Sequence, residues 1–168
     1  YPWVARYEWH KTSLADFLQT LVEAGIEARP MGDSGIILTQ PLPVEKVPGF
    51  AQGLVSVQDY GAQLAAPLLD MHDGMRILDA CCAPGGKTGH VLELSEVTML
   101  AVDSDADRLD RTRSNLDRLG LKAALLQGDA ANPAVWWDGI AFDRILADVP
   151  CSASGIVRRH VDIKWLRR

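Results

Sequence analysis

The stretch RILDACCAPGGKT, residues 76–88, decides the fold. Its first part, Arg76 to Ala80, is mostly apolar and predicts a short buried strand. Gly85 and Gly86 follow and let the backbone approach a ligand, and a helix over Lys87–Leu94 then offers its N-terminal N–H groups. A strand, a glycine turn and a helix in this order are typical of an α/β unit that binds a ligand at its strand ends.

The spacing of these glycines excludes two common nucleotide-binding motifs. It matches neither the G-x-G-x-x-G fingerprint of dinucleotide-binding domains nor the G-x-x-x-x-G-K of a P-loop. A nicotinamide-dependent dehydrogenase is therefore a poor interpretation. The turn by itself leaves two interpretations open, ligand binding and an ordinary tight connection.

Strands and helices alternate after this turn. We predict strands over Thr98–Val102, Ala123–Leu126 and Arg144–Ala147, and a long helix that Ser104 caps and Gly120 ends. The β-α-β-α-β-β order predicts an α/β fold with a mostly parallel sheet, ending after about four strands. We expect the fourth strand to be an open edge, which is a hazard for self-association.

The first 48 residues predict a small α/β subdomain. Strands over Trp3–Tyr7 and Ile36–Thr39 flank a helix that Ser13 caps and Gly25 ends. This subdomain precedes the sheet described above.

A cluster of prolines and a glycine in residues 41–49 marks a linker. We therefore predict two domains, residues 1–48 and residues 49–168. Just after the linker, Ser56 and Asp59 form a second capping pattern, which predicts a helix that Pro67 kinks or shortens.

The composition excludes several further classes of protein. The chain has 168 residues, 48% hydrophobic and 23% charged, which is enough for a packed core. No apolar run approaches the roughly 18 residues of a membrane span, and the start lacks the pattern of a signal peptide. Three cysteines, two of them adjacent, fit a reducing cytoplasmic setting and not the spacing of a zinc site, so we expect no metal.

The charge is unevenly distributed. A net charge of −5 argues against an indiscriminate nucleic-acid binder. Residues 158–168, however, hold five basic residues and one acidic residue, a net of +4. This segment suits contact with phosphate, and it equally suits a solvated helix end.

Acidic residues follow three successive predicted strands. Asp103 is placed to accept hydrogen bonds from ribose hydroxyls, and Asp129 to accept one from the amino group of an adenine. Asp148 follows the fourth strand. One such acid is unremarkable, since Asp103 also suits a helix start, but three around a glycine turn predict a nucleoside site.

The octapeptide DVPCSASG, residues 148–155, contains a candidate nucleophile. Methylation at carbon 5 of a pyrimidine requires temporary attack at carbon 6, and a thiolate such as that of Cys151 attacks and leaves well. A small buried cysteine is the equally weighted alternative.

These motifs resemble those of the RNA cytosine-5 methyltransferases. Residues 78–88 resemble the family's cofactor loop, and residues 148–155 resemble its D-A-P-C-S-A-T-G motif. Residues 158–165, RRHVDIKW, resemble the R-R-H-P-D-I-K-W segment of the Sun/Fmu branch, which methylates a cytosine in bacterial small-subunit ribosomal RNA. The resemblance covers residues 49–168 well and the first 48 weakly, and it implies a Rossmann-like core that depends on S-adenosyl-L-methionine.

The resemblance also implies roles for individual residues. Asp148 borders the methyl donor and the target base. Cys151 is the second cysteine, which helps to release the product, because the attacking thiolate belongs to a later T-C motif that residues 1–168 do not contain. The cofactor-binding residues are expected to be Cys81, Cys82, Ala83, Pro84, Gly85, Gly86, Lys87, Asp103, Arg108, Asp129 and Asp148.

Two departures from the family pattern limit what carries over. Val161 replaces a proline, and Arg6-Tyr7-Glu8 lies where relatives have R-x-N, which leaves early RNA contacts in doubt. We expect a cofactor-binding fragment, inactive alone, of an enzyme whose partner is small-subunit ribosomal RNA and not a membrane. The alternatives are a DNA-type cytosine-5 methyltransferase with Cys151 as nucleophile and a non-catalytic module that binds cofactor or RNA.

Overall fold

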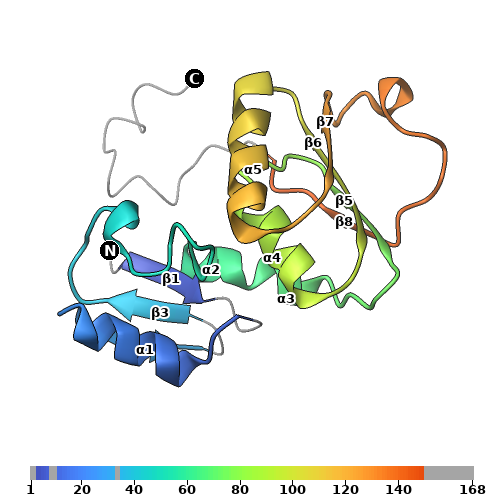
Figure 1. The fold of residues 1–168 in the computed structure, drawn as a ribbon. Helices are drawn as coiled ribbons and strands as arrows, with labels where there is room; N and C mark the ends of the chain where they lie inside the picture. The colour runs from blue at the N-terminus through green and yellow to red at the C-terminus, as the bar shows by residue number, and fades with distance from the viewer. Residues whose placement is uncertain (1–2, 8–10, 33–34, 150–168) are drawn as a thin grey trace, which may run out of the picture.

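A computed structural model describes residues 3–7, 11–32 and 35–149 of the chain. Two sheets, each with its own helices, make up the described part (Figure 1). In chain order the elements are β1 (Trp3–Tyr7), α1 (Leu14–Glu23), β2 (Ala28–Met31), β3 (Gly35–Leu38), η1 (Val44–Lys46), β4 (Val55–Val57), α2 (Tyr60–Gln63), α3 (Ala65–Leu68), β5 (Arg76–Asp79), α4 (Gly86–Leu94), β6 (Thr98–Asp103), α5 (Ala106–Leu119), β7 (Ala124–Gln127), η2 (Pro133–Val135) and β8 (Arg144–Leu146).

The first sheet is antiparallel, with strand order β2-β3-β1-β4. Helix α1 begins as predicted, because the Ser13 hydroxyl accepts a hydrogen bond from the Asp16 N–H at 3.1 Å. Phe17 and Leu21 on its inner face are buried against β1 and β3 in one apolar cluster. The predicted strands at Trp3–Tyr7 and near Ile36–Thr39 are confirmed as β1 and β3.

Two of the predictions for this region are wrong. Ser56 is not a helix cap, since it lies in β4, which pairs with β1 through Ala5 and Val57. The expected single helix is two short ones, α2 and α3, with Pro67 inside the second. The first sheet thus includes a strand beyond residue 48, and the domain boundary at 48/49 stays a prediction.

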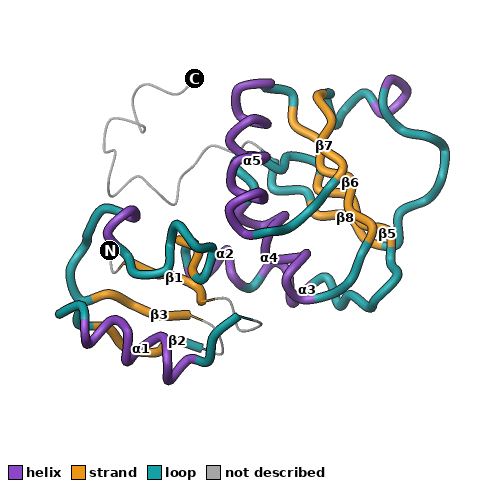
Figure 2. Tube along the Cα trace, in the orientation of Figure 1, coloured by secondary structure: helices purple, strands orange, loops and turns teal. Residues whose placement is uncertain are grey.

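The second sheet is parallel, with strand order β7-β6-β5-β8, as the alternation of strands and helices predicts. Successive side chains of its strands point to opposite faces. One face, with Ile77, Met99 and Ala101, packs on α3, α4 and α5, and these helices and the sheet appear as separate layers in Figure 2. The other face, with Leu78 and Val102, packs on the segment that contains Trp136 and Phe142.

The cap of α5 differs from the prediction. Asp105, and not Ser104, is the N-cap residue, and its carboxylate accepts a hydrogen bond from the Arg108 N–H at 3.1 Å. Gly120 ends the helix as predicted, with a left-handed φ of 72°.

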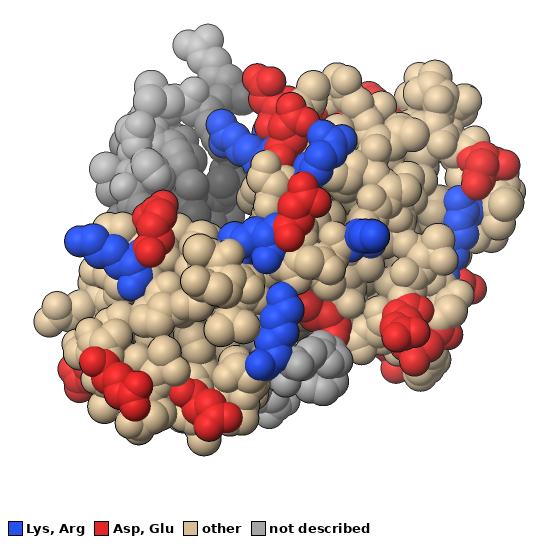
Figure 3. All heavy atoms as spheres, viewed as in Figure 1, with Lys and Arg blue, Asp and Glu red and all other residues tan. Residues whose placement is uncertain are grey.

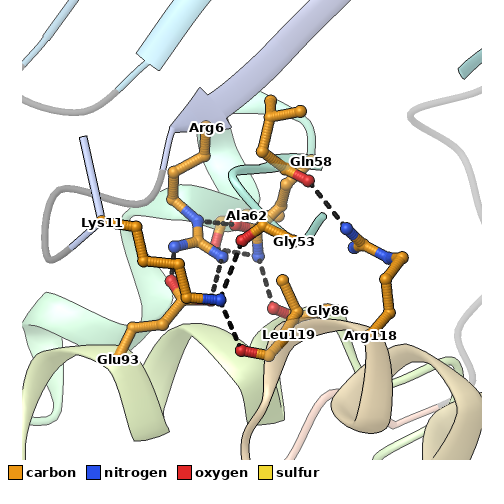
Figure 4. A network of polar contacts seen from close by, with 10 residues as sticks. Arg6, Lys11, Gly53, Gln58, Ala62, Gly86, Glu93, Arg118 and Leu119 are labelled. Carbon is orange, nitrogen blue, oxygen red and sulfur yellow. Dashed lines mark hydrogen bonds and ion pairs between the residues drawn. The ribbon is translucent and has the colours of Figure 1, made fainter. Parts of the chain in front are cut away.

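A buried polar network joins the two sheets. Arg6 of β1 is 1% exposed and reaches toward Gln58 and Glu93 (Figure 4). Its guanidinium pairs with the carboxylate of Glu93 on α4. Arg6 is therefore buried in this pair, whereas Glu8, which replaces the asparagine of the R-x-N pattern, lies outside the described residues.

On the face shown in Figure 3, basic and acidic side chains are intermixed over α5 and the first sheet. The predicted basic segment, residues 158–168, lies outside the described residues. Within the described ranges, no helix is both long and apolar enough to cross a lipid bilayer, and no three His, Cys, Asp or Glu side chains are grouped to hold a metal ion. Strand β8 is an outer strand of its sheet among the described residues, and self-association through it stays a prediction.

Candidate functional site

A cavity of about 340 Å³ lies at the carboxyl ends of the four parallel strands. Parallel sheets of this kind bind ligands at that edge. Each of the four strands is followed by residues of the wall, which are Ala80, Cys81, Ala83, Asp103, Ser104, Arg108, Gly128, Asp129, Ala130 and Asp148.

The glycine turn connects β5 to α4 on one side of this cavity. Gly85 has a left-handed φ of 91° and is the N-cap residue of α4, a conformation that other residues rarely adopt. A Cβ atom at Gly85 would lie 2.9 Å from Cγ2 of Thr112, so the close approach of α5 also requires glycine. At Gly86, by contrast, a Cβ atom would meet nothing within 4 Å, which leaves the first turn of α4 open.

Asp79, the last residue of β5, holds the start of this helix. Its Oδ2 accepts a hydrogen bond from the Thr88 hydroxyl at 2.7 Å, while its Oδ1 is buried without a hydrogen-bond partner. Burial raises the pKa of Asp79 to about 6, against the opposing effects of the Thr88 hydroxyl, the Cys81 backbone N–H and the charge of Lys87. Asp79 was not among the predicted site residues, although an acid at the end of an apolar strand is a usable signal.

Asp103 ties the glycine turn to the second strand. Its carboxylate is 3% exposed and accepts hydrogen bonds from the N–H groups of Ala83 at 3.1 Å and Asp105 at 3.2 Å. Arg108 donates to the Ala83 carbonyl at 2.8 Å, and its Nη1 lies 3.6 Å from Oδ1 of Asp103. These contacts bring Ala83, Asp103 and Arg108, all predicted site residues, together in the wall of the cavity.

Asp129 lies in the loop after β7. Its Oδ1 accepts a hydrogen bond from the Ala131 N–H at 2.9 Å, and its carbonyl accepts one from the indole N–H of Trp136 at 2.8 Å. The Gly128 N–H donates to the Asp103 carbonyl at 3.0 Å. Asp103, the last residue of β6, is thus hydrogen-bonded through its carbonyl to the loop that carries Asp129, the second predicted nucleoside-binding acid.

Lys87 and Asp148 form an ion pair at the edge of the cavity. The Lys87 Nζ and Asp148 Oδ2 atoms are 2.5 Å apart, and the Asp148 side chain is 59% exposed. An exposed pair of this kind exchanges readily with other partners, because water screens it. Asp148 therefore presents a carboxylate at the mouth of the cavity that an incoming hydrogen-bond donor can reach.

The two adjacent cysteines lie in different surroundings. Cys81 lines the cavity, whereas Cys82 is buried in the apolar cluster beneath the sheet. Burial raises the pKa of the Cys82 thiol to about 12, and burial with the nearby Asp103 charge raises that of Cys81. Neither thiol is therefore a reactive thiolate near neutral pH.

The remaining predicted residues fall into two groups. Five of them are not part of the cavity wall, to which the connection between β5 and α4 contributes Ala80, Cys81 and Ala83; the five are Cys82, Pro84, Gly85, Gly86 and Lys87. Cys151 lies outside the described residues. Trp136 contacts the loop of Asp129 and was not predicted from the sequence.

A parallel sheet of order β7-β6-β5-β8, with a glycine turn after β5 and acids at the ends of the other strands, has the Rossmann-like fold of the S-adenosylmethionine-dependent methyltransferases. The model of the family "16S rRNA methyltransferase RsmB/F" matches residues 66–168. The chain belongs to this family.

Individual relatives agree with this assignment. The chain is 50% identical to ribosomal RNA small subunit methyltransferase B of Pseudomonas syringae pv. tomato and 51% identical to that of Pseudomonas putida, in each case over 99% of the chain. It spans only 38% and 39% of the length of these relatives. The crystal structure of a methyltransferase homologue from Pyrococcus horikoshii matches 98% of the chain and 55% of its own length, with a TM-score of 0.80 and 33% identity.

Proposed function

We propose that this chain is the methyl-donor-binding part of an enzyme that methylates carbon 5 of a cytosine in small-subunit ribosomal RNA, with S-adenosyl-L-methionine as donor. The cavity at the strand ends supports this proposal, because acids at the ends of three strands, Asp103, Asp129 and Asp148, line it. The substrate class is supported by the relatives' designation as ribosomal RNA small subunit methyltransferases.

The residues of the cavity fit such a donor. Its volume of about 340 Å³ is within the range of small-molecule sites. Asp103 would accept hydrogen bonds from the two ribose hydroxyls, and Asp129 would accept one from the adenine amino group. Acidic side chains also favour a ligand with positive charge, and the donor carries its transferable methyl group on a positively charged sulfur.

The residues at the mouth would meet the target base. Asp148 would accept hydrogen bonds from a cytosine amino group, and Lys87 beside it would orient the carboxylate. The family resemblance assigns product release to Cys151 and the attack on carbon 6 to a later cysteine beyond residue 168. Residues 158–168, with a net charge of +4, would contact RNA phosphates. The enzyme would then work in the cytoplasm, where its RNA is.

Binding of the demethylated product, S-adenosylhomocysteine, tests the donor site. Asp103→Asn should weaken binding by about ten- to a hundredfold, because hydrogen bonds to a carboxylate contribute on the order of 1.5–3 kcal/mol. Asp107→Asn, a change of the same kind at an exposed acid of α5, should leave the affinity at the wild-type value. Calorimetry measures both, and equal effects of the two substitutions would contradict the assignment of Asp103.

Transfer of tritiated methyl groups tests the reaction. The longer protein that contains this chain should label small-subunit ribosomal RNA at carbon 5 of cytosine, whereas residues 1–168 alone should bind the donor without transfer. Efficient transfer by residues 1–168, or a covalent adduct between Cys151 and a 5-fluorocytosine RNA, would favour Cys151 as the nucleophile instead.

A further inference from the structure

The indole of Trp136 is packed against the loop that carries Asp129. A Cβ atom built on Gly128 would lie 2.9 Å from Cδ1 of Trp136, so the ring covers this residue at contact distance. The ring also belongs to the apolar cluster of Leu78, Ala80 and Val102 on the sheet. Trp136 is thereby anchored to the core and in contact with the floor of the cavity.

Four hydrogen bonds hold the loop that carries the Asp129 carboxylate. The indole N–H of Trp136 donates to the Asp129 carbonyl at 2.8 Å, and the Asn132 N–H donates to the same carbonyl at 2.9 Å. The Ala131 N–H donates to the side-chain Oδ1 at 2.9 Å, and the Gly128 N–H ties the loop to the Asp103 carbonyl of β6 at 3.0 Å. Of these four donors, only that of Trp136 is a side chain, and its ring is also packed on the apolar cluster of the sheet.

We propose that Trp136 is a positioning residue that sets the selectivity of the methyl-donor site for adenine. It holds Asp129 so that its carboxylate faces the amino group of the base. The inference rests on the proposed function and goes beyond it, because it assigns base selectivity to a side chain that does not line the cavity.

A chemically matched pair of ligands measures this selectivity. S-inosylhomocysteine differs from S-adenosylhomocysteine in that a carbonyl oxygen replaces the amino group, so a well-placed carboxylate would lose a donor and face an acceptor instead. The ratio of the two dissociation constants therefore reports how well Asp129 is placed. Loss of general stability alone weakens both ligands and leaves this ratio unchanged.

Trp137 provides a matched control for Trp136. Its indole N–H also donates to a backbone carbonyl at 2.8 Å, that of Ile140, but its side chain is 45% exposed and is not part of the cavity wall. Trp136→Phe and Trp137→Phe therefore remove the same kind of hydrogen bond one residue apart.

Calorimetry with both ligands on the wild type and the two variants tests the proposal. Trp136→Phe should lower the selectivity ratio by about five- to tenfold, as expected for one misplaced hydrogen-bond acceptor, mainly by weakening S-adenosylhomocysteine. Trp137→Phe should keep the wild-type ratio. A wild-type ratio in Trp136→Phe, an equal loss in Trp137→Phe, or a wild type without preference between the ligands would overturn the role of Trp136.

A second variant covers the case in which Trp136→Phe does not fold. Gly128→Ala introduces a methyl group against the Trp136 ring and should also lower the ratio, whereas an unchanged ratio in a folded Gly128→Ala protein would count against the proposal. If the wild type binds neither ligand, the proposed donor site itself is wrong. If it binds with selectivity that neither variant alters, only the role of Trp136 is wrong.

Discussion

At the scale of single residues, the stability of the fold depends on the protonation of Asp79, which lies beside the glycine turn. The carboxyl group is 1% exposed, and the pKa of about 6 lies above its ordinary value of 3.8 because burial disfavours the charge. The folded protein therefore binds more protons at this group than the unfolded chain does between pH 4 and 6. Stability is lost as the pH rises through this window, and above it the loss is constant.

Asp79→Asn should remove this pH dependence. The wild type should lose on the order of 3 kcal/mol of unfolding free energy between pH 4 and pH 7, since each unit of pKa corresponds to about 1.4 kcal/mol. The variant should not show this loss. Urea denaturation at several pH values measures this difference. Asp107→Asn, at an exposed site, should follow the wild-type profile, and a parallel profile for Asp79→Asn would show that Asp79 does not titrate in this range.

The sequence predicts some residues of the site better than others. Asp103, Asp129 and Asp148 are found at the cavity because an acid directly after an apolar strand must lie at the strand's carboxyl end. Trp136 escapes prediction, since its contact with Asp129 depends on the path of the loop after β7 and not on any periodic pattern. The burial of Cys82 beside the exposed turn is likewise set by packing between layers.

At the scale of elements, the predictions succeed where the apolar pattern of an element is clear and fail where another local signal masks it. The helices α1 and α5 have an apolar face, and the parallel strands are short, mostly apolar runs. Strand β2 contains Pro30, which argues against a strand, but β2 is an edge strand and tolerates a residue without an N–H group. Strand β4 has only three residues, and its Ser56 mimics a helix cap.

The contact between the loop before β4 and the end of α5 depends on Gly53. Its φ is 67°, and a Cβ atom there would lie 2.3 Å from the carbonyl oxygen of Arg118. Gly74 also has a left-handed φ, of 85°, but a Cβ atom there would meet nothing within 4 Å. A substitution at Gly74 therefore introduces backbone strain alone, whereas the same substitution at Gly53 adds a steric conflict.

Gly74→Ala should cost about 1–2 kcal/mol of unfolding free energy, the strain of a left-handed residue with a side chain. Gly53→Ala should cost clearly more, because α5 or the loop must also move away. Urea denaturation of the two variants measures the difference, and equal costs would mean that the loop shifts freely from α5.

At the scale of the whole molecule, the two sheets are joined by charged side chains and not by apolar packing alone. Arg6 donates to Glu93 through Nη2 at 3.1 Å and to Gln58 through Nε at 3.3 Å. Gln58 in turn donates to the carbonyl of Gly86, at the start of α4, at 3.4 Å. Lys11 and Arg118 add hydrogen bonds to backbone carbonyls, Lys11 to those of Gly53 and Leu119 and Arg118 to those of Phe50 and Val55.

Because Arg6 and Glu93 are 1% and 5% exposed, removal of one charge takes a close ionic partner from the other, which stays buried. Glu93→Leu should therefore cost about 3–5 kcal/mol of unfolding free energy, and Arg6→Met a similar amount. The double variant should cost much less than the sum of the two, since no buried charge remains. At the exposed pair of Arg113 and Asp110, Asp110→Asn should cost less than about 1 kcal/mol. Additive costs at Arg6 and Glu93 in a double-mutant cycle would show that the two sheets are held together without this ion pair.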